Sequence, residues 1–474
     1  MKKKIVYLSF ILVLVISVIT LSSIYKSKDN KYKKEYNTIS KGMAIMIKEE
    51  GATDYVKSNS KDIPKGNYVL NRDKSYCKNN GKIGNYDSSL GKISFSFIGT
   101  DSCYLYFDYK KETIKLGSAE LVVNSETPDF SKVATTNEGL FKAQDDLGTS
   151  YYFRGAVDNN WVKFGKDSTG KDIYWRIIRI NGDGSIRMIY TGTTAPTSST
   201  ATVMTGDGTQ ISTSKLNGSY NNPIYVGYMY TLDEQHGNST TSTIKTTIDN
   251  WYKMTTLKDN DLVADRLFCN DRSATKSTSS TPGEIGGLST SSDYYYGTYI
   301  RLITNKTPLL TCPTASDKFT VNASNGNGAL IYPVGFITAD EVAMAGGVYG
   351  QENKTFYLYS NQNYWSMSPR YYYGYDAGAN EFYINSAGNL KDSRVDNSYG
   401  VRPVVSLSSK AKLSGSGTYN DVYTVVTNDS TEDTSSGKSF DTVFVANNAD
   451  IFNEKGIRYE GTDPYNYICL DNKT

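Results

Sequence analysis

The stretch that decides the fold is IYWRIIRINGDGSIRMIYTG, residues 173–192. Two runs rich in Ile, Tyr, Trp and Arg flank the turn sequence NGDG at 181–184, in which Asn and Gly tolerate the positive φ of a tight hairpin turn. The alternative, a calcium loop built on NGDGS, lacks most of the acidic positions of such a loop. The stretch therefore predicts a β-hairpin of two antiparallel strands.

Helix and strand patterns alternate around this hairpin. Apolar residues at helical spacing between Ile244 and Tyr252 predict one helix with a buried face. Thr338 and Glu341 match a capping box that starts a second, shorter helix. Further strands are predicted over residues 356–359, 364–367, 382–384 and 401–407. We therefore expect one domain of the α+β class in this part of the chain.

The remaining segments differ in composition. An apolar stripe predicts a helix over residues 37–57, and alternating apolar residues then predict a small β module. Residues 459–470 align without gaps on 153–164, either as a partial second copy or by chance. The expected parts are 1–25 (cytoplasmic lysines and anchor), 26–60 (stalk helix), 61–110 (β module), 111–150 (linker and lead-in strands), 151–408 (main domain), 409–445 (linker) and 446–474 (possible partial copy).

The N-terminus carries the pattern of a membrane anchor. Lys2, Lys3 and Lys4 precede an apolar run over residues 5–24, which is about the 20 residues that cross a bilayer as a helix. A cleaved secretory signal is the alternative, although a shorter core and an A-x-A-like site are typical of one. We expect a transmembrane helix, and hence a single-pass protein of the cell membrane with most of the chain outside.

Five cysteines are present, and none shows the C-x-x-C spacing of metal or redox sites. Outside the cell, two disulfides would leave one thiol over, whereas five reduced thiols are the alternative. The expected pairs are Cys77 with Cys103, around a strand-rich segment, and Cys269 with Cys312, around a polar loop, with Cys469 left over.

Charge and histidine content exclude several classes of function. The formal net charge is only +2, and the lysines of the first 35 residues account for the excess, so no basic stripe for nucleic acid remains. His236 is the only histidine, which excludes His-rich metal sites and most His-dependent catalytic triads within one chain. We expect no metal, no cofactor and no nucleic-acid partner.

Several motifs resemble a known family of domains. They are IYWRIIRINGDGSIRMIY at 173–190, YPVGFITADEVAMAGG at 332–347, YWSMSP at 364–369 and YGVRPVVSL at 399–407. Together they resemble bacterial surface proteins of the Firmicutes type that carry a C-type-lectin-like, formylglycine-generating-enzyme-like domain. The resemblance implies a closing strand that pairs near the start of the domain. The late cysteine pair, the iron-binding histidines and the EPN, QPD or WND tripeptides of catalytic and sugar-binding relatives are missing, which argues against their activities.

The segment between YWSMSP and GVRPVVSL is the candidate binding surface. It is rich in Tyr, Asn, Asp, Ser and Gly, a composition typical of antibody-like contact surfaces. It also resembles segments that retroelements diversify at adenines, while a plain polar loop is the alternative. The expected contact residues are Arg370, Tyr371, Tyr372, Tyr373, Tyr375, Asp376, Lys391, Asp392, Arg394, Asp396 and Asn397.

The sequence thus predicts a surface-displayed receptor or adhesin that binds an extracellular protein or glycan without catalysis. A structural cell-envelope protein that associates with its own copies is the main alternative. An enzyme is disfavoured because acidic pairs are the available acid-base groups and none has a diagnostic spacing.

Overall fold

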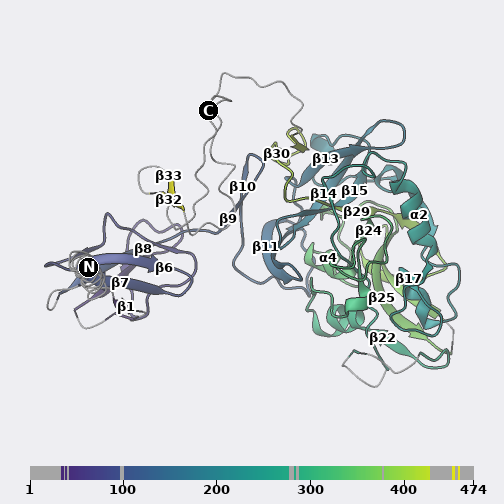
Figure 1. The fold of residues 1–474 in the computed structure, drawn as a ribbon, viewed down its shortest axis with the longest axis horizontal. Helices are drawn as coiled ribbons and strands as arrows, with labels where there is room; N and C mark the ends of the chain where they lie inside the picture. Colours follow the sequence, from purple (N-terminus) through teal and green to yellow (C-terminus); the bar gives the residue numbers. More distant parts are fainter. Residues whose placement is uncertain are drawn as a thin grey trace, which may run out of the picture. The chain divides into compact units, whose positions relative to one another are not determined.

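The computed structural model describes residues 34–36, 38–39, 42–96, 101–276, 282–283, 288–375 and 378–426, and the backbone of 451–453 and 457–459. The chain divides into two compact units, Met1–Thr113 and Ile114–Thr474. Figure 1 shows the strands of both units. Each unit is described by itself.

The first unit consists of two small sheets. One has the order β1-β7-β6, and the other has the order β3-β2-β8-β4 with β5 also paired to β8. Side chains alternate along β8, with Cys103, Leu105 and Phe107 buried and the residues between them partly exposed. The strands are β1 Lys34–Tyr36, β2 Ala44–Lys48, β3 Val56–Lys57, β4 Tyr68–Leu70, β5 Tyr76–Cys77, β6 Lys82–Asp87, β7 Lys92–Ser96 and β8 Cys103–Tyr109.

The prediction of a helix over residues 37–57 is wrong. Its place is taken by β2, which runs parallel to β8 along its whole length, and by β3, which pairs antiparallel with β2. Pairing with a strand more than fifty residues away outweighs the local apolar spacing, because it buries Ala44 and Ile45 in the core of the unit. The expected disulfide is confirmed, since Cys77 on β5 bonds to Cys103, its direct partner on β8.

The second unit contains a large curled sheet and a second, seven-stranded sheet. The large sheet is built on β14 and β15, which β29, β13 and β12 extend on either side. Its strands are β11 Asn137–Asp145, β12 Gly148–Gly155, β13 Trp161–Lys166, β14 Asp172–Ile180, β15 Ile186–Gly192, β19 Val263–Ala264, β24 Gly335–Phe336, β29 Pro403–Leu407, β30 Leu413–Ser414 and β31 Tyr423–Val425.

The seven-stranded sheet carries the candidate site. Its order is β16-β28-β25-β22-β21, and β26 and β27 extend it as a hairpin from β25. The strands are β16 Ser212–Lys215, β21 Ala274–Lys276, β22 Tyr294–Tyr296, β25 Tyr364–Tyr373, β26 Gly378–Ile384, β27 Leu390–Arg394 and β28 Ser398–Val401.

Short elements complete the described residues. The α-helices are α2 Thr243–Tyr252, α3 Gly297–Tyr299 and α4 Ala339–Met344, and η4 Ile300–Asn305 is a π-helix. The 3₁₀ turns are η1 Ser198–Thr200, η2 Asp207–Thr209, η3 Pro223–Val226 and η5 Ala315–Asp317. The remaining strand pairs are β9 Thr113–Leu116 with β10 Ala119–Val122, β17 Met229–Tyr230 with β18 Thr240–Thr241, β20 Phe268–Cys269 with β23 Lys318–Phe319, and β32 Ile451–Asn453 with β33 Ile457–Tyr459.

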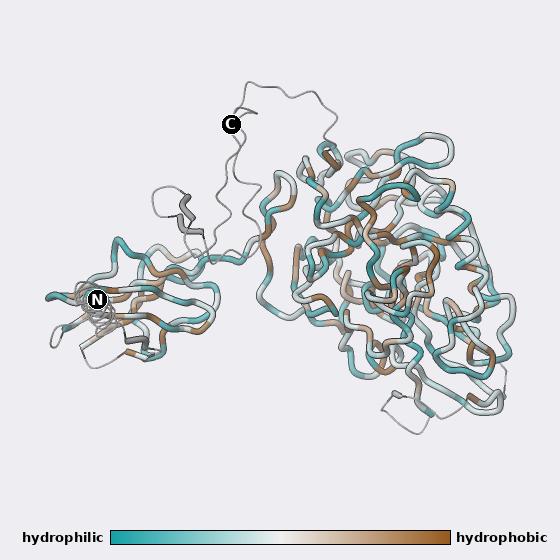
Figure 2. The backbone as a smooth tube through the Cα atoms, viewed as in Figure 1, coloured by the Kyte–Doolittle hydropathy of each residue, from teal (hydrophilic) through white to brown (hydrophobic). Residues whose placement is uncertain are grey.

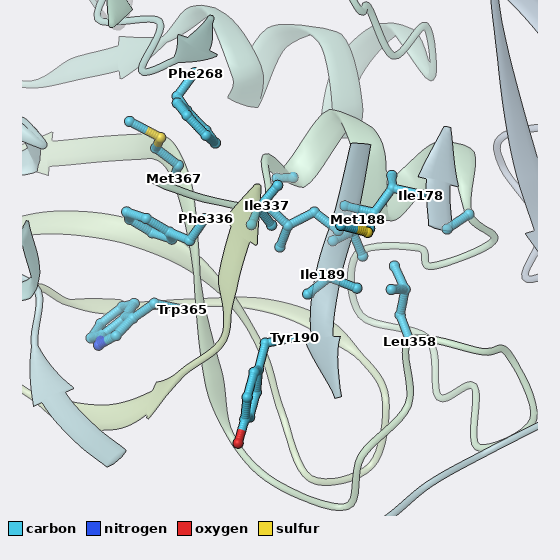
Figure 3. Close-up of a cluster of buried hydrophobic side chains, with 14 of the residues drawn as sticks. Ile178, Met188, Ile189, Tyr190, Phe268, Phe336, Ile337, Leu358, Trp365 and Met367 are labelled. Carbon is cyan, nitrogen blue, oxygen red and sulfur yellow. The ribbon is translucent and has the colours of Figure 1, made fainter. Parts of the chain in front are cut away.

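The predicted hairpin is confirmed. β14 and β15 pair antiparallel, and Gly184 adopts φ +80° in the turn between them. Every residue of β15 is buried, and its Met188 and Ile189 belong to the cluster of buried side chains in Figure 3. Figure 2 shows hydrophobic stretches, in brown, running through the inside of this unit. The two predicted helices are also confirmed, as α2 and as α4 with the capping box of Thr338 and Glu341.

The expected α+β class with a transmembrane helix is wrong. Strands hold 40% of the residues and helices 10%, so the fold is β-rich. The two predicted helices are short, with 10 residues in α2 and 6 in α4. Among the described residues, no helix is long and apolar enough to cross a membrane, contrary to the expected single-pass localisation. The apolar run at 5–24, on which that expectation rested, lies outside the described residues.

The second unit extends beyond the expected limits of 151–408. The lead-in strand β11 pairs with β12, which in turn pairs with β14. After residue 408, β31 pairs in parallel with β13, so part of the expected linker belongs to the large sheet. The second expected disulfide, Cys269 with Cys312, is confirmed in this unit. The possible copy at 446–474 lies outside the described residues except for the backbone of β32 and β33.

Candidate functional site

The end of β25 carries a group of partly exposed aromatic residues around one arginine. Arg370, Tyr371 and Tyr373 lie on β25, and Tyr295 lies opposite Tyr371 on the neighbouring strand β22. Other members come from α3, from the loop after α4 and from β27. We call this group the arginine–tyrosine cluster, and it consists of Tyr295, Tyr299, Tyr349, Arg370, Tyr371, Tyr373 and Asp392.

Arg370 is held from several sides. Its guanidinium carbon lies 4.1 Å from the ring centre of Tyr371, 5.0 Å from that of Tyr299 and 5.5 Å from that of Tyr349. Its Nε lies 3.3 Å from Oδ1 of Asp392, and the two side chains are only 13% and 15% exposed. Partial removal from water strengthens both cation–π and ionic contacts, so the arginine is fixed in place.

The hydroxyl groups of Tyr349 and Tyr371 stay protonated around neutral pH. Tyr349 donates a hydrogen bond of 2.6 Å to Oδ1 of Asp392. Burial, followed by this carboxylate, raises the pKa of Tyr349 to about 12. Burial, followed by the charge of Asp392, likewise raises the pKa of Tyr371 to about 12. Both phenols therefore remain hydrogen-bond donors.

The rings pack against one another in pairs. Tyr371 and Tyr373 lie 4.2 Å apart between ring centres, and Tyr295 and Tyr299 stack at 4.4 Å. The two pairs are neighbours because Tyr295 lies opposite Tyr371 in the sheet, and a hydrogen bond with Tyr373, followed by burial, raises the pKa of Tyr295. All four residues are partly exposed. The sheet and α3 thus present a group of packed, partly exposed aromatic rings.

The structure brings together four of the predicted contact residues, Arg370, Tyr371, Tyr373 and Asp392. Tyr375 is nearby in the chain and 99% exposed, whereas Asp376 lies outside the described residues. Lys391 pairs with Tyr383 across the hairpin. Since side chains alternate along a strand, Lys391 points to the face opposite Asp392.

The other predicted contact residues have partners outside the cluster. Arg394 stacks 3.9 Å over the ring of Tyr220 and forms an exposed ion pair with Asp396. The side chain of Asn397 donates to Oγ of Ser393 at 2.8 Å, within the β27–β28 turn.

The prediction that Tyr372 is a contact residue is wrong. It is fully buried, and its hydroxyl donates to the backbone carbonyls of Asn221 and Thr290. Strand alternation explains the error, because Tyr371 and Tyr373 face outward and the residue between them must face the core.

Sequence reasoning missed Tyr295, Tyr299 and Tyr349. They come from segments about 75 and 20 residues before Arg370, so the candidate segment does not contain them. The signal at 292–297, SDYYYG, resembles the candidate segment in composition, but composition alone does not show that β22 pairs with β25.

The one histidine belongs to a buried ionic network. Nδ1 of His236 lies 2.9 Å from Oδ2 of Asp317, and Oδ1 of the same carboxylate accepts bonds from Nε and Nη2 of Arg272 at 2.8 and 2.6 Å. Arg272 and Asp317 are almost fully buried. This network ties the loop around 236 to the strands near 272 and 317, which is a structural role.

The described part of the chain offers no usable set of metal ligands. The single group of suitable side chains there is Cys77, Asp101 and Cys103, and its two sulfur atoms are joined in the disulfide. A disulfide sulfur is no thiolate ligand.

Behind the site, β26 buries a carboxyl group. Glu381 is 0% exposed, and neither carboxyl oxygen has a hydrogen-bond partner within the described residues. Burial raises its pKa well above the usual value, and the charge of Arg272 only partly opposes this. Burial therefore favours the neutral, protonated form of Glu381 in the folded protein.

The chain matches no known family model, no curated protein and no solved structure.

Proposed function

We propose that this chain is a non-enzymatic protein that binds an extracellular ligand, a protein or a glycan, through the arginine–tyrosine cluster. The observation that carries the proposal is the fixed position of Arg370 among three tyrosine rings and Asp392. A surface that is already ordered loses little entropy when a ligand binds, so more of the contact energy appears as affinity.

The residue types of the cluster also support binding. Tyrosine and arginine are enriched at the energetic centres of interfaces, and a tyrosine side chain has few rotamers to lose. Tyr371, Tyr373, Tyr295 and Tyr299 offer flat rings and hydroxyl donors on one side of the sheet. The exposed Tyr375, two residues after Tyr373, adds further contact area to this surface.

Two further features support an extracellular role and the lectin-like resemblance. Disulfides are typical of proteins in oxidising compartments, and both units contain one. The pairing of β29, from the motif GVRPVVSL, with β15 supports a C-type-lectin-like domain. In such a domain the β25–β27 segment is the proposed variable region, diversified by a retroelement.

The test measures binding of the full chain to fibrinogen, collagen, mucin and purified bacterial cell-wall polysaccharide by biolayer interferometry. For a bound probe, Tyr371→Ala/Tyr373→Ala should weaken affinity by about tenfold or more. The matched control is Tyr419→Ala, which truncates an exposed tyrosine between β30 and β31. Equal affinity of the double variant and the wild type would refute the assignment.

Sedimentation velocity on the same proteins separates binding from the structural alternative. A monomeric wild type at all concentrations supports a binding protein. Concentration-dependent association that the double variant abolishes, and the Tyr419→Ala control retains, would instead indicate that the cluster packs against a second copy.

A further inference from the structure

The first unit contains a hollow of its own. Its volume is about 460 Å³, within the usual size of small-molecule sites. The turn between β2 and β3, from Glu49 to Tyr55, forms one wall, and the end of β8 with Asp108 forms another. Asn71 and Lys74, which follow β4, complete it.

The carboxylates that line the hollow already have donors in the protein. Asp108 accepts a bond of 2.5 Å from the Tyr55 hydroxyl and one of 2.8 Å from the Asn71 amide. Glu50 lies 2.5 Å from the ammonium group of Lys111. Glu49 accepts from the hydroxyl of Tyr68 at 3.1 Å. Each carboxylate has about four acceptor positions, so capacity for a ligand remains.

The charges of the hollow cancel in formal terms. Three lysines, Lys48, Lys74 and Lys111, balance the three carboxylates. An anionic or cationic ligand would therefore find no excess of opposite charge. Carboxylate acceptors and ammonium donors at the same surface instead suit hydroxyl groups, because a hydroxyl both donates and accepts.

An aromatic ring completes the chemistry. Tyr55 faces Lys74, whose ammonium group lies 4.7 Å from the ring centre, and the Tyr55 hydroxyl is fixed by Asp108 and Asn71. The ring is thereby held at the wall of the hollow. Tyr55 is partly exposed and lines the hollow, so it supplies apolar surface beside the polar groups, as a ligand with an apolar face and several hydroxyls requires.

We infer that this hollow binds a neutral sugar unit. The hydroxyl groups of the sugar donate to the carboxylates of Asp108 and Glu50, and they exchange hydrogen bonds with the Asn71 amide. The Lys74 ammonium group donates to them, and Tyr55 contacts the carbon–hydrogen face of the sugar. The inference concerns the first unit alone and does not depend on the arginine–tyrosine cluster.

The test uses the full chain with N-acetylglucosamine, glucose, galactose, chitobiose and lactose as neutral probes, and N-acetylneuraminic acid and arginine as charged ones. Saturation-transfer NMR detects the bound sugar protons, and calorimetry gives affinities at the millimolar level. At least one neutral probe should bind, and the charged probes should bind more weakly. A glycan array then distinguishes a cell-surface glycan from a free sugar as the source.

Lys74→Met should weaken that binding by about tenfold, since a hydrogen bond from a charged group is lost. The matched control is Lys78→Met, because Lys78 is also an exposed lysine above a tyrosine, Tyr104 at 5.5 Å, but does not line the hollow. Tyr371→Ala/Tyr373→Ala should leave sugar binding unchanged. Absence of binding by every neutral probe, equal loss in both lysine variants, or stronger binding of a charged probe would overturn the inference.

Discussion

The buried acid Glu381 predicts an unusual dependence of stability on pH. Its folded-state pKa lies well above the ordinary value of 4.5, mainly because of burial. Between pH 4.5 and the folded-state pKa, the native protein therefore binds one proton more than the unfolded chain. The free energy of unfolding then falls with rising pH, by about 1.4 kcal/mol per pH unit for one proton.

Glu381→Gln removes this titration at nearly constant shape. We expect the stability of the variant, relative to the wild type, to increase by about 1.4 kcal/mol for each pH unit above 4.5, until the folded-state pKa is reached. The difference between the two proteins cancels the other titrating groups. Urea unfolding at several pH values measures it.

Tryptophan fluorescence is a suitable probe for this experiment, because all four tryptophans lie after residue 114 and report on the second unit alone. Glu352→Gln is the matched control, since it makes the same change at a side chain that is 63% exposed. Parallel pH profiles for the wild type and Glu381→Gln would show that Glu381 is ionised in the fold, and would refute the reasoning.

Three further outcomes are expected. Replacing Cys269 and Cys312 by Ser should lower the free energy of unfolding by about 4 kcal/mol, because the bond closes a loop with a separation of 43 residues; urea unfolding of the second unit measures this. Tyr372→Ala should cost about 3–5 kcal/mol through an internal cavity, whereas Tyr371→Ala at the partly exposed neighbour should cost far less, as thermal unfolding would show. If a retroelement diversifies the segment, codon sequencing across the source population should find variation at 371 and constancy at 372.

Local signals in the sequence predicted the elements that local contacts stabilise. The hairpin turn at 181–184 and the capping box of Thr338 and Glu341 need only neighbours within a few residues. The prediction of a helix over 37–57 failed because β2 is stabilised by pairing with β8, and no local sequence pattern shows this pairing. The excess of strand over helix has the same origin, since sheet pairing links distant segments.

The candidate site shows the same division. Arg370, Tyr371, Tyr373 and Asp392 could be named because they lie within one segment of suitable composition. Tyr299 and Tyr349 could not, because only the fold brings them to Arg370. The error at Tyr372 was avoidable in principle, since alternation along a strand forbids three successive outward side chains.

The fold holds Tyr299 and Tyr375 very differently. Arg301, two residues after Tyr299, forms ion pairs with Asp271 at 2.6 Å and with Asp340 at 2.9 Å. These largely buried pairs tie the helical turn that carries Tyr299 to α4 and to the strand region near 271. Tyr375, in contrast, is almost fully exposed in the turn between β25 and β26. Under the proposed function, we expect substitutions at Tyr375 to change binding without disturbing the fold, whereas changes near Arg301 would misplace the Tyr299 ring against which Arg370 packs.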